Sequence, residues 1–150
     1  MEYKIFESSD TNVKKFVFEW GASAVTKKGI AEAVLYRYGE YAKRTVICCS
    51  VQSGCPVGCT FCGTGKFFVR NLDWHKIIEQ VTTVLSTIDC NTKDIEKFQI
   101  MFMSMGEPFL NYINLERAIE SLHDLYPNAQ LLVSTSAPST LYHAMSEFIE

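Results

Sequence analysis

The sequence predicts an α/β fold in which about three strand–helix units build a parallel sheet, preceded by a small N-terminal β-meander. From residue 44 onward, short apolar runs alternate with longer segments whose apolar residues recur at helical spacing. Strands separated by helices pair in parallel, because only a long crossover returns the chain to the same end of the sheet. Before residue 44, two strand-like runs follow each other without a helix between them. We therefore expect residues 1–43 to form a β extension and residues 44–150 to form the α/β domain.

The N-terminal elements are short. Residues 1–13 are polar, and we expect them to be loosely held. Strand composition marks residues 15–20 and residues 30–38, with a connection between them. A third strand, residues 44–51, leads directly into a loop rich in cysteine.

The elements after this loop follow the helical and strand patterns in turn. Asp73 is a good N-cap for a helix, and that helix has one apolar face formed by Trp74, Ile77, Ile78, Val81, Val84 and Leu85. Residues 98–103 form an almost unbroken apolar run, typical of a parallel strand buried on both faces. Asn114 is expected to cap a second helix, residues 131–135 to form another buried strand, and residues 138–148 to form a third helix.

Three chemically distinctive segments follow the three predicted parallel strands. They are the cysteine loop, the segment Gly106–Glu107–Pro108 and the segment Ser134–Thr135–Ser136. In parallel sheets the functional groups gather at the carboxyl ends of the strands. The sequence therefore predicts one active site made from these three loops.

The cysteine loop contains Cys55, Cys59 and Cys62 at the spacing C-x3-C-x2-C. Three thiolates this close in sequence can hold three corners of a cubane 4Fe-4S cluster, which normally takes four cysteines. A site with three protein ligands leaves one metal position open for a substrate or cosubstrate. Gly54 and Gly58 let the backbone fold tightly around such a group.

Other uses of these cysteines are less compatible with the sequence. Zinc would need a fourth Cys or His, and the three histidines, at positions 75, 123 and 143, form no paired motif. A disulfide framework does not fit cysteines bunched in one loop. Three buried structural thiols are the remaining alternative. The spacing favours an iron–sulfur cluster over all of these.

Composition bounds the class of protein. Hydrophobic residues make up 47% and charged residues 21% of the 150 residues, as in globular domains. The net charge of −3 argues against a strongly basic nucleic-acid platform. No apolar run has membrane-spanning length, and residues 1–10 lack the apolar core of a signal peptide. With six cysteines, this predicts a cytoplasmic location.

The wider cysteine segment resembles a known family. Residues 50–65, S-V-Q-S-G-C-P-V-G-C-T-F-C-G-T-G, followed by Arg70-Asn71-Leu72, are similar to the radical S-adenosylmethionine (SAM) methyltransferases of the RlmN/Cfr family. The resemblance implies a partial (β/α) barrel of radical SAM type, a 4Fe-4S cluster on Cys55, Cys59 and Cys62, and SAM as a second cofactor. It also implies reductive cleavage of SAM to a 5′-deoxyadenosyl radical and methylation of adenine C2 or C8 in rRNA or tRNA.

The same resemblance suggests roles for five further residues. Residues 103–111 are similar to the family segment in which a Gly-Glu pair binds the aminoacyl part of SAM, which implies that Gly106 and Glu107 bind it here. Ser134 corresponds to a serine that contacts SAM. Cys48, seven positions before Cys55, corresponds to a cysteine that resolves a protein–RNA intermediate, and Glu32 to a proton acceptor.

Without the resemblance, each of these residues has a simpler interpretation. Glu107 would be a solvated loop residue and Ser134 a strand-end cap. Cys48 and Cys49 are adjacent on a strand and face opposite sides, so at least one of them would be a small buried apolar residue. Glu32 would be a solvent-facing strand residue.

The resemblance covers only part of a family protein. The chain has three of the six βα units and lacks the C-terminal cysteine that carries the methyl group, and its loop after Cys62 is one residue shorter, with Phe67-Phe68. A sheet of three parallel strands leaves an open edge. We expect completion by self-association or by a partner chain, an electron donor such as flavodoxin or ferredoxin, and RNA as the substrate. The alternatives are a radical SAM enzyme with another substrate, or a catalytically incomplete fragment that acts through a partner.

Overall fold

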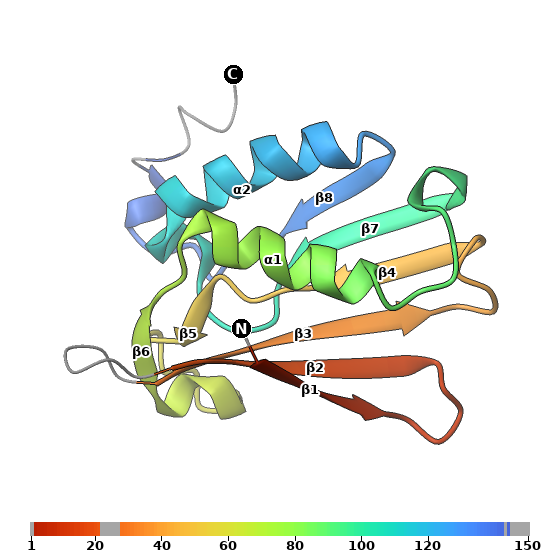
Figure 1. The fold of residues 1–150 in the computed structure, drawn as a ribbon. Coiled ribbons are helices and arrows are strands. Elements are labelled where there is room, and N and C mark those ends of the chain that lie inside the picture. The colour runs from red at the N-terminus through yellow and green to blue at the C-terminus, as the bar shows by residue number, and fades with distance from the viewer. Residues whose placement is uncertain (1, 22–27, 143, 145–150) are drawn as a thin grey trace.

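The computed structural model describes residues 2–21, 28–142 and 144, and its centre is one six-stranded sheet (Figure 1). The strands of this sheet, in spatial order, are β1 (Glu2–Glu7), β2 (Val13–Trp20), β3 (Gly29–Arg37), β4 (Arg44–Cys48), β7 (Lys97–Phe102) and β8 (Ala129–Val133). A second, two-stranded sheet contains β5 (Gln52–Gly54) and β6 (Phe68–Asn71). The helices are α1 (Trp74–Leu85) and α2 (Tyr112–Leu125), with single 3-10 turns η1 (Gly63–Lys66), η2 (Thr92–Asp94) and η3 (Pro108–Leu110).

The sheet changes character at β4. Strands β1 to β4 pair antiparallel, whereas β4 pairs with β7 and β7 pairs with β8 in parallel. Helix α1 lies between β4 and β7 in the chain, and α2 between β7 and β8. This confirms the predicted α/β fold with a β-meander leading into parallel strands. The described strands form an open sheet and not a closed barrel, as expected for a partial barrel.

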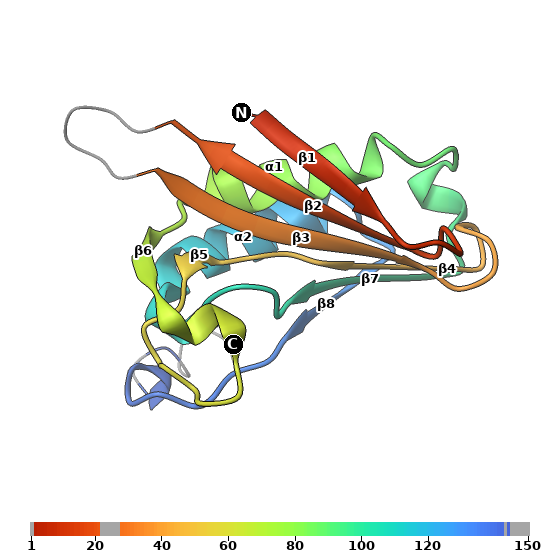
Figure 2. The ribbon, with the colours of Figure 1, turned by 90° about the horizontal axis from the view of Figure 1, so that it is seen from below.

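Both helices cover the same face of the sheet (Figures 1 and 2). Their apolar residues meet alternate residues of the strands and form a single core. The strands contribute Phe16, Phe18, Ala31, Ala33, Leu35, Ile47, Phe98, Ile100 and Phe102, and the helices contribute Ile77, Val81, Val84, Leu115, Ala118 and Leu122. Asp73 caps α1 as predicted, since its carboxylate accepts a hydrogen bond from Lys76 N at 3.2 Å.

The prediction that residues 1–13 are loosely held is wrong. Strand β1 pairs with β2 over its whole length, from Glu2 opposite Glu19 to Glu7 opposite Lys14. The Tyr3 ring packs 6.1 and 5.8 Å from the rings of Phe16 and Phe18, measured between centroids. A strand of polar composition is stable here because its apolar side chains cover an aromatic row on the neighbouring strand.

Strand β7 is not buried on both faces. Phe98, Ile100 and Phe102 are buried against the helices, whereas Gln99 and Met101 on the other face are half-buried. This other face of the sheet, which we call the open face, carries no helix of the described residues. Strand β8 at the edge is half-buried for the same reason.

Two helix predictions need correction or fall outside the structure. Asn111, and not Asn114, is the N-cap of α2. Asn114 Oδ1 instead accepts a hydrogen bond from Trp74 N at 3.2 Å and so ties α2 to the start of α1. The predicted helix over residues 138–148 lies largely outside the described residues. No helix of the described chain is long and apolar enough to cross a membrane.

The two faces of β7 predict different costs of mutation. Ile100→Ala removes a fully buried side chain, and we expect the free energy of unfolding to fall by about 2–5 kcal/mol. Met101→Ala, the next residue on the open face, serves as the control and should cost clearly less. Urea unfolding measures both. Equal losses would show that something covers the open face in solution.

Candidate active site at the carboxyl ends of the parallel strands

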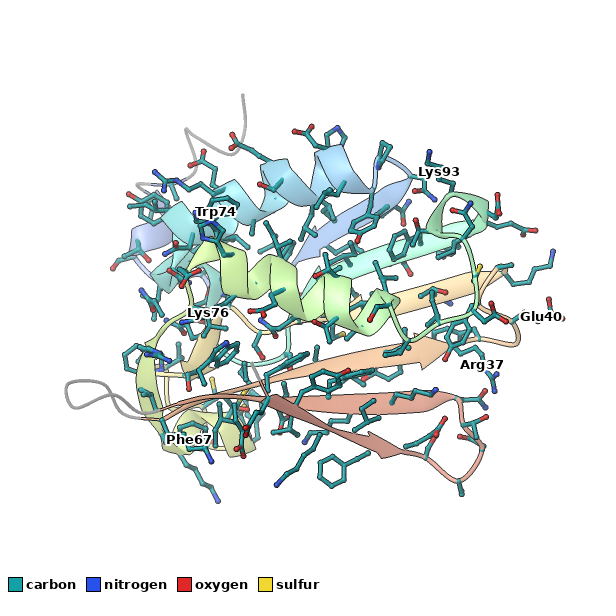
Figure 3. The ribbon with its side chains drawn as sticks, viewed as in Figure 1. Arg37, Glu40, Phe67, Trp74, Lys76 and Lys93 are labelled. Atoms are coloured by element: carbon teal, nitrogen blue, oxygen red, sulfur yellow. The ribbon has the colours of Figure 1, made fainter. Side chains whose placement is uncertain are left out.

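The three loops predicted to form one site do meet. Thr135 Oγ1, Ser136 N and Ser136 Oγ all donate hydrogen bonds to the Glu107 carboxylate, so the loops after β7 and β8 are in contact. Glu107 N donates to Gln52 Oε1 at 2.8 Å, and Gln52 lies three residues before Cys55. The cysteine loop is therefore part of the same cluster of loops. Figure 3 shows Phe67 of this loop at one end of the molecule, with Arg37 and Glu40 at the other.

The cysteine loop is held closed at its base. Cys55 N donates a hydrogen bond to Phe67 O at 2.8 Å, and β5 and β6 pair antiparallel just outside the loop. Gly54 has a φ of +80°, and a Cβ atom there would lie 2.2 Å from Phe67 O. Only glycine fits this conformation and this close approach. Inside the loop, Cys62 N donates to Cys59 O at 3.1 Å.

The three cysteines of the loop are free thiols and half-buried. Burial raises the pKa of Cys55, and the negative charges of Cys59, Cys62 and Glu107 raise it further. The backbone N–H groups of Thr64 and Gly65 face the Cys62 thiol and lower its pKa. The loop thus holds Cys55 toward the neutral thiol and Cys62 toward the thiolate.

The residue types of this loop are those that a 4Fe-4S cluster takes. Three free thiols lie in one loop, and the thiolates of a cubane cluster each bind a different iron. The backbone N–H groups of Thr64 and Gly65 are directed at Cys62, and hydrogen bonds to sulfur are one way in which proteins tune such clusters. Among the described residues, no three Cys, His, Asp or Glu side chains are arranged to hold a single metal ion.

Glu107 is buried, with 4% of its surface exposed, and its carboxylate is fully surrounded by donors. Oε1 accepts from Phe109 N at 3.1 Å and from Thr135 Oγ1, and Oε2 accepts from Ser136 N and Ser136 Oγ, both at 2.8 Å. Burial acts to raise the pKa of Glu107, but these hydrogen bonds outweigh it and hold the pKa below the usual 4.5. Glu107 is thus a buried anion held by hydrogen-bond donors and not a solvated loop residue.

Ser134 does not share this arrangement. Its side chain is exposed, and the next two residues, Thr135 and Ser136, reach Glu107 instead. The sequence placed the whole segment at the site but could not distinguish its three hydroxyls, because the turn after β8 decides which of them face Glu107. A SAM contact by Ser134 stays a prediction.

Cys48 and Cys49 point to opposite faces, as predicted. Cys49 is fully buried in the core, whereas Cys48 is half-buried on the open face, with its sulfur 4.0 Å from Met101 Sδ. Burial raises the pKa of Cys48. The simpler interpretation of a small buried apolar residue thus describes Cys49. The thiol of Cys48 is only half-buried and lies on the open face.

Glu32 also lies on the open face, where its carboxylate pairs with Lys15 Nζ at 2.7 Å. Its main chain is tied to the site through Ser50. Ser50 Oγ donates to Glu32 O at 2.6 Å and accepts from Met105 N at 3.2 Å. A part-exposed ion pair on this face fits the simpler interpretation of a solvent-facing strand residue, and the role of Glu32 as a proton acceptor stays a prediction.

Sequence reasoning missed the buried amides that join the loops. Gln52, Gln80 and Asn111 are each at most 4% exposed. Asn111 Nδ2 donates to Val51 O and Leu72 O, both at 2.8 Å. Gln80 Nε2 donates to Ser50 O at 3.0 Å. A buried amide must find partners, but nothing in the sequence alone indicates that these amides are buried.

Solved structures show the same architecture. A crystal structure of a radical SAM methyltransferase from Sphaerobacter thermophilus matches 95% of this chain with a TM-score of 0.75 at 29% identity, and the match covers 40% of that protein. The fold thus matches part of a radical SAM methyltransferase. No protein-family model matches the chain.

Sequence relatives identify the branch of this class. The chain is 42% identical over 93 residues to the probable dual-specificity RNA methyltransferase RlmN of Heliobacterium modesticaldum, covering 60% of this chain and 24% of that protein. It is 34% identical over 118 residues to the protein of that name from Dictyoglomus turgidum, covering 78% and 31%. The chain is therefore similar to part of RlmN-type RNA methyltransferases, and it spans about a quarter to a third of the length of these relatives.

The hydrogen bonds of Glu107 predict a pH-dependent stability. Because its pKa is lower in the folded chain, Glu107 stabilises the fold fully above pH 4.5, and this contribution is lost as the pH falls through the folded-state pKa. Glu107→Gln puts an NH2 group against the donors and should cost roughly 1–3 kcal/mol at pH 7.

Urea unfolding between pH 7 and pH 3 tests this. The gap between the parent chain and Glu107→Gln should shrink below pH 4.5. Glu120→Gln, on the exposed surface of α2, is the control and should show no such gap. A gap that stays constant down to pH 3 would contradict the assignment of Glu107 as the ionised group.

Proposed function

We propose that this chain is the cluster-binding and SAM-binding part of an RlmN-type RNA methyltransferase. Cys55, Cys59 and Cys62 would hold a 4Fe-4S cluster, and Gly106, Glu107 and Ser134 would contact SAM. When bound and reduced, the cluster supplies the electron that cleaves SAM to a 5′-deoxyadenosyl radical. The observation that carries this proposal is a loop with three free thiols beside a buried, ionised carboxylate.

The Glu107 carboxylate is suited to receive the ammonium group of SAM. Two of its four donors, Phe109 N and Ser136 N, are fixed by the backbone. The other two are the hydroxyls of Thr135 and Ser136, which can rotate toward other acceptors. An incoming ammonium can therefore replace the hydroxyls while the backbone donors keep the carboxylate ionised and in place.

The open face of the sheet is where we propose that the substrate base is handled. Cys48 and Glu32 both lie there, on adjacent strands. In this proposal Cys48 resolves a covalent intermediate with an adenine of rRNA or tRNA, and Glu32, once released from Lys15, accepts a proton. A flavodoxin or ferredoxin would supply electrons, and a cytoplasmic location would keep the thiols reduced.

A second candidate is a subunit or fragment that needs a partner chain. The open face and the half-buried edge strand β8 favour it, because parallel sheets are normally covered on both faces. In this case the site would bind its cofactors only after association. The third candidate is a radical SAM enzyme that acts on a substrate other than RNA at the same site.

Anaerobic reconstitution with iron and sulfide, followed by dithionite and SAM, tests the first proposal. We expect a 4Fe-4S spectrum and release of 5′-deoxyadenosine, measured by chromatography. Cys59→Ala should lose both. Cys90→Ala is the matched control. Cys90 is a free cysteine in the loop after α1, where its sulfur donates a hydrogen bond to Asn91 O. This variant should keep both the 4Fe-4S spectrum and the release of 5′-deoxyadenosine.

The outcomes separate the candidates. Absence of iron after reconstitution would overturn the cluster assignment. A cluster that forms but leaves SAM intact would favour the partner-dependent subunit. Methylated adenine in RNA incubated with the full-length protein would count against a different substrate.

A further inference from the structure

The side chain of Gln52 joins the cysteine loop to the loop that carries Glu107. Gln52 is 1% exposed and lies in β5, three residues before Cys55. Its Oε1 accepts a hydrogen bond from Glu107 N at 2.8 Å, and its Nε2 donates one to Asn71 Oδ1 at 2.7 Å. A single amide thus satisfies a buried N–H of one loop and a side chain of another.

The neighbouring main chains are equally close. Val51 N and Gln52 N both donate to Met105 O, at 2.9 and 3.2 Å. Gly106 has a φ of +101°, and a Cβ atom there would lie 2.6 Å from Gln52 Cβ and 2.9 Å from Gln52 N. The space that glycine leaves at position 106 is therefore filled by Gln52.

Asn71 extends the connection beyond Glu107. Its Nδ2 donates to Leu110 O at 3.2 Å, while its Oδ1 accepts from Gln52. The segment around Glu107 is thus held on both sides, at its own N–H by Gln52 and at Leu110 O by Asn71. Gln52 and Asn71 each use both the donor and the acceptor of their side-chain amide in this arrangement.

We propose that Gln52 is a positioning residue that fixes the Glu107 carboxylate relative to the cysteine loop. This inference rests on the proposed function and deepens it. A ligand held by both Glu107 and a cluster on Cys55, Cys59 and Cys62 needs the two loops at a fixed relative position. The same inference assigns Gly106 a steric role in admitting Gln52, besides any contact with SAM.

Gln80 provides a matched control. It is also a buried glutamine, 0% exposed, and makes three hydrogen bonds, to Ser50 N and Ser50 O at 3.0 Å and to Lys76 O at 3.1 Å. These bonds attach α1 to the strand end and do not involve Glu107. Gln80→Met therefore removes a comparable buried amide that makes no hydrogen bond to Glu107. Its partner Ser50 also accepts from Met105 N at 3.2 Å, so the comparison is made at residues 107–111.

Hydrogen exchange of the cluster-free chain tests the positioning role. In Gln52→Met the Glu107 N–H loses its acceptor, and we expect exchange of residues 107–111 to rise by roughly tenfold. Gly106→Ala, which displaces Gln52 from the other side, should give the same local increase. Gln80→Met should leave residues 107–111 protected, whatever its effect on the melting temperature.

The result that would overturn the proposal is an exchange rate in this segment that is unchanged in both Gln52→Met and Gly106→Ala, or raised equally by Gln80→Met. A second arm measures SAM binding to the reconstituted chain by equilibrium dialysis. There Gln52→Met should weaken binding at least roughly tenfold while Gln80→Met does not. If the parent chain itself binds no SAM, the proposed function fails, and the exchange data alone still decide the role of Gln52.

Discussion

A buried carboxylate must be surrounded by donors, and this requirement organises the end of the molecule where the loops meet. Glu107 is almost completely removed from water, so each of its oxygens must be satisfied by the protein. The donors come from its own turn and from the loop after β8. Its N–H in turn requires an acceptor, which β5 supplies. Satisfying one residue therefore brings three loops together.

The parallel pairing of β4, β7 and β8 makes this possible, because it delivers all three loops to the same edge of the sheet. The antiparallel strands before it serve a different purpose. They extend the sheet and carry Glu32 and its partner Lys15 on the open face, beside the strand of Cys48. The residues proposed to bind cofactors thus lie in the loops at one edge of the sheet, and those proposed to act on the substrate lie on its open face.

The sequence was sufficient for the order of the elements and for the meeting of the three loops, because apolar periodicity and the strand–helix alternation are properties of the chain itself. It was not sufficient for β1, whose stability depends on Tyr3 covering Phe16 and Phe18. Nor could it find Gln52, because a glutamine becomes structural only when folding buries it. The choice of Thr135 and Ser136 over Ser134 depends in the same way on a local turn.

The two edges of the six-stranded sheet differ in charge. Strand β1 carries three charged side chains, Glu2, Lys4 and Glu7, and such charges discourage the addition of another strand. Strand β8, with the sequence A-Q-L-L-V, has none. A further strand can therefore add more easily at β8 than at β1. The charges of β1 disfavour pairing there, whereas β8 is uncharged and already pairs in parallel with β7 on its other side.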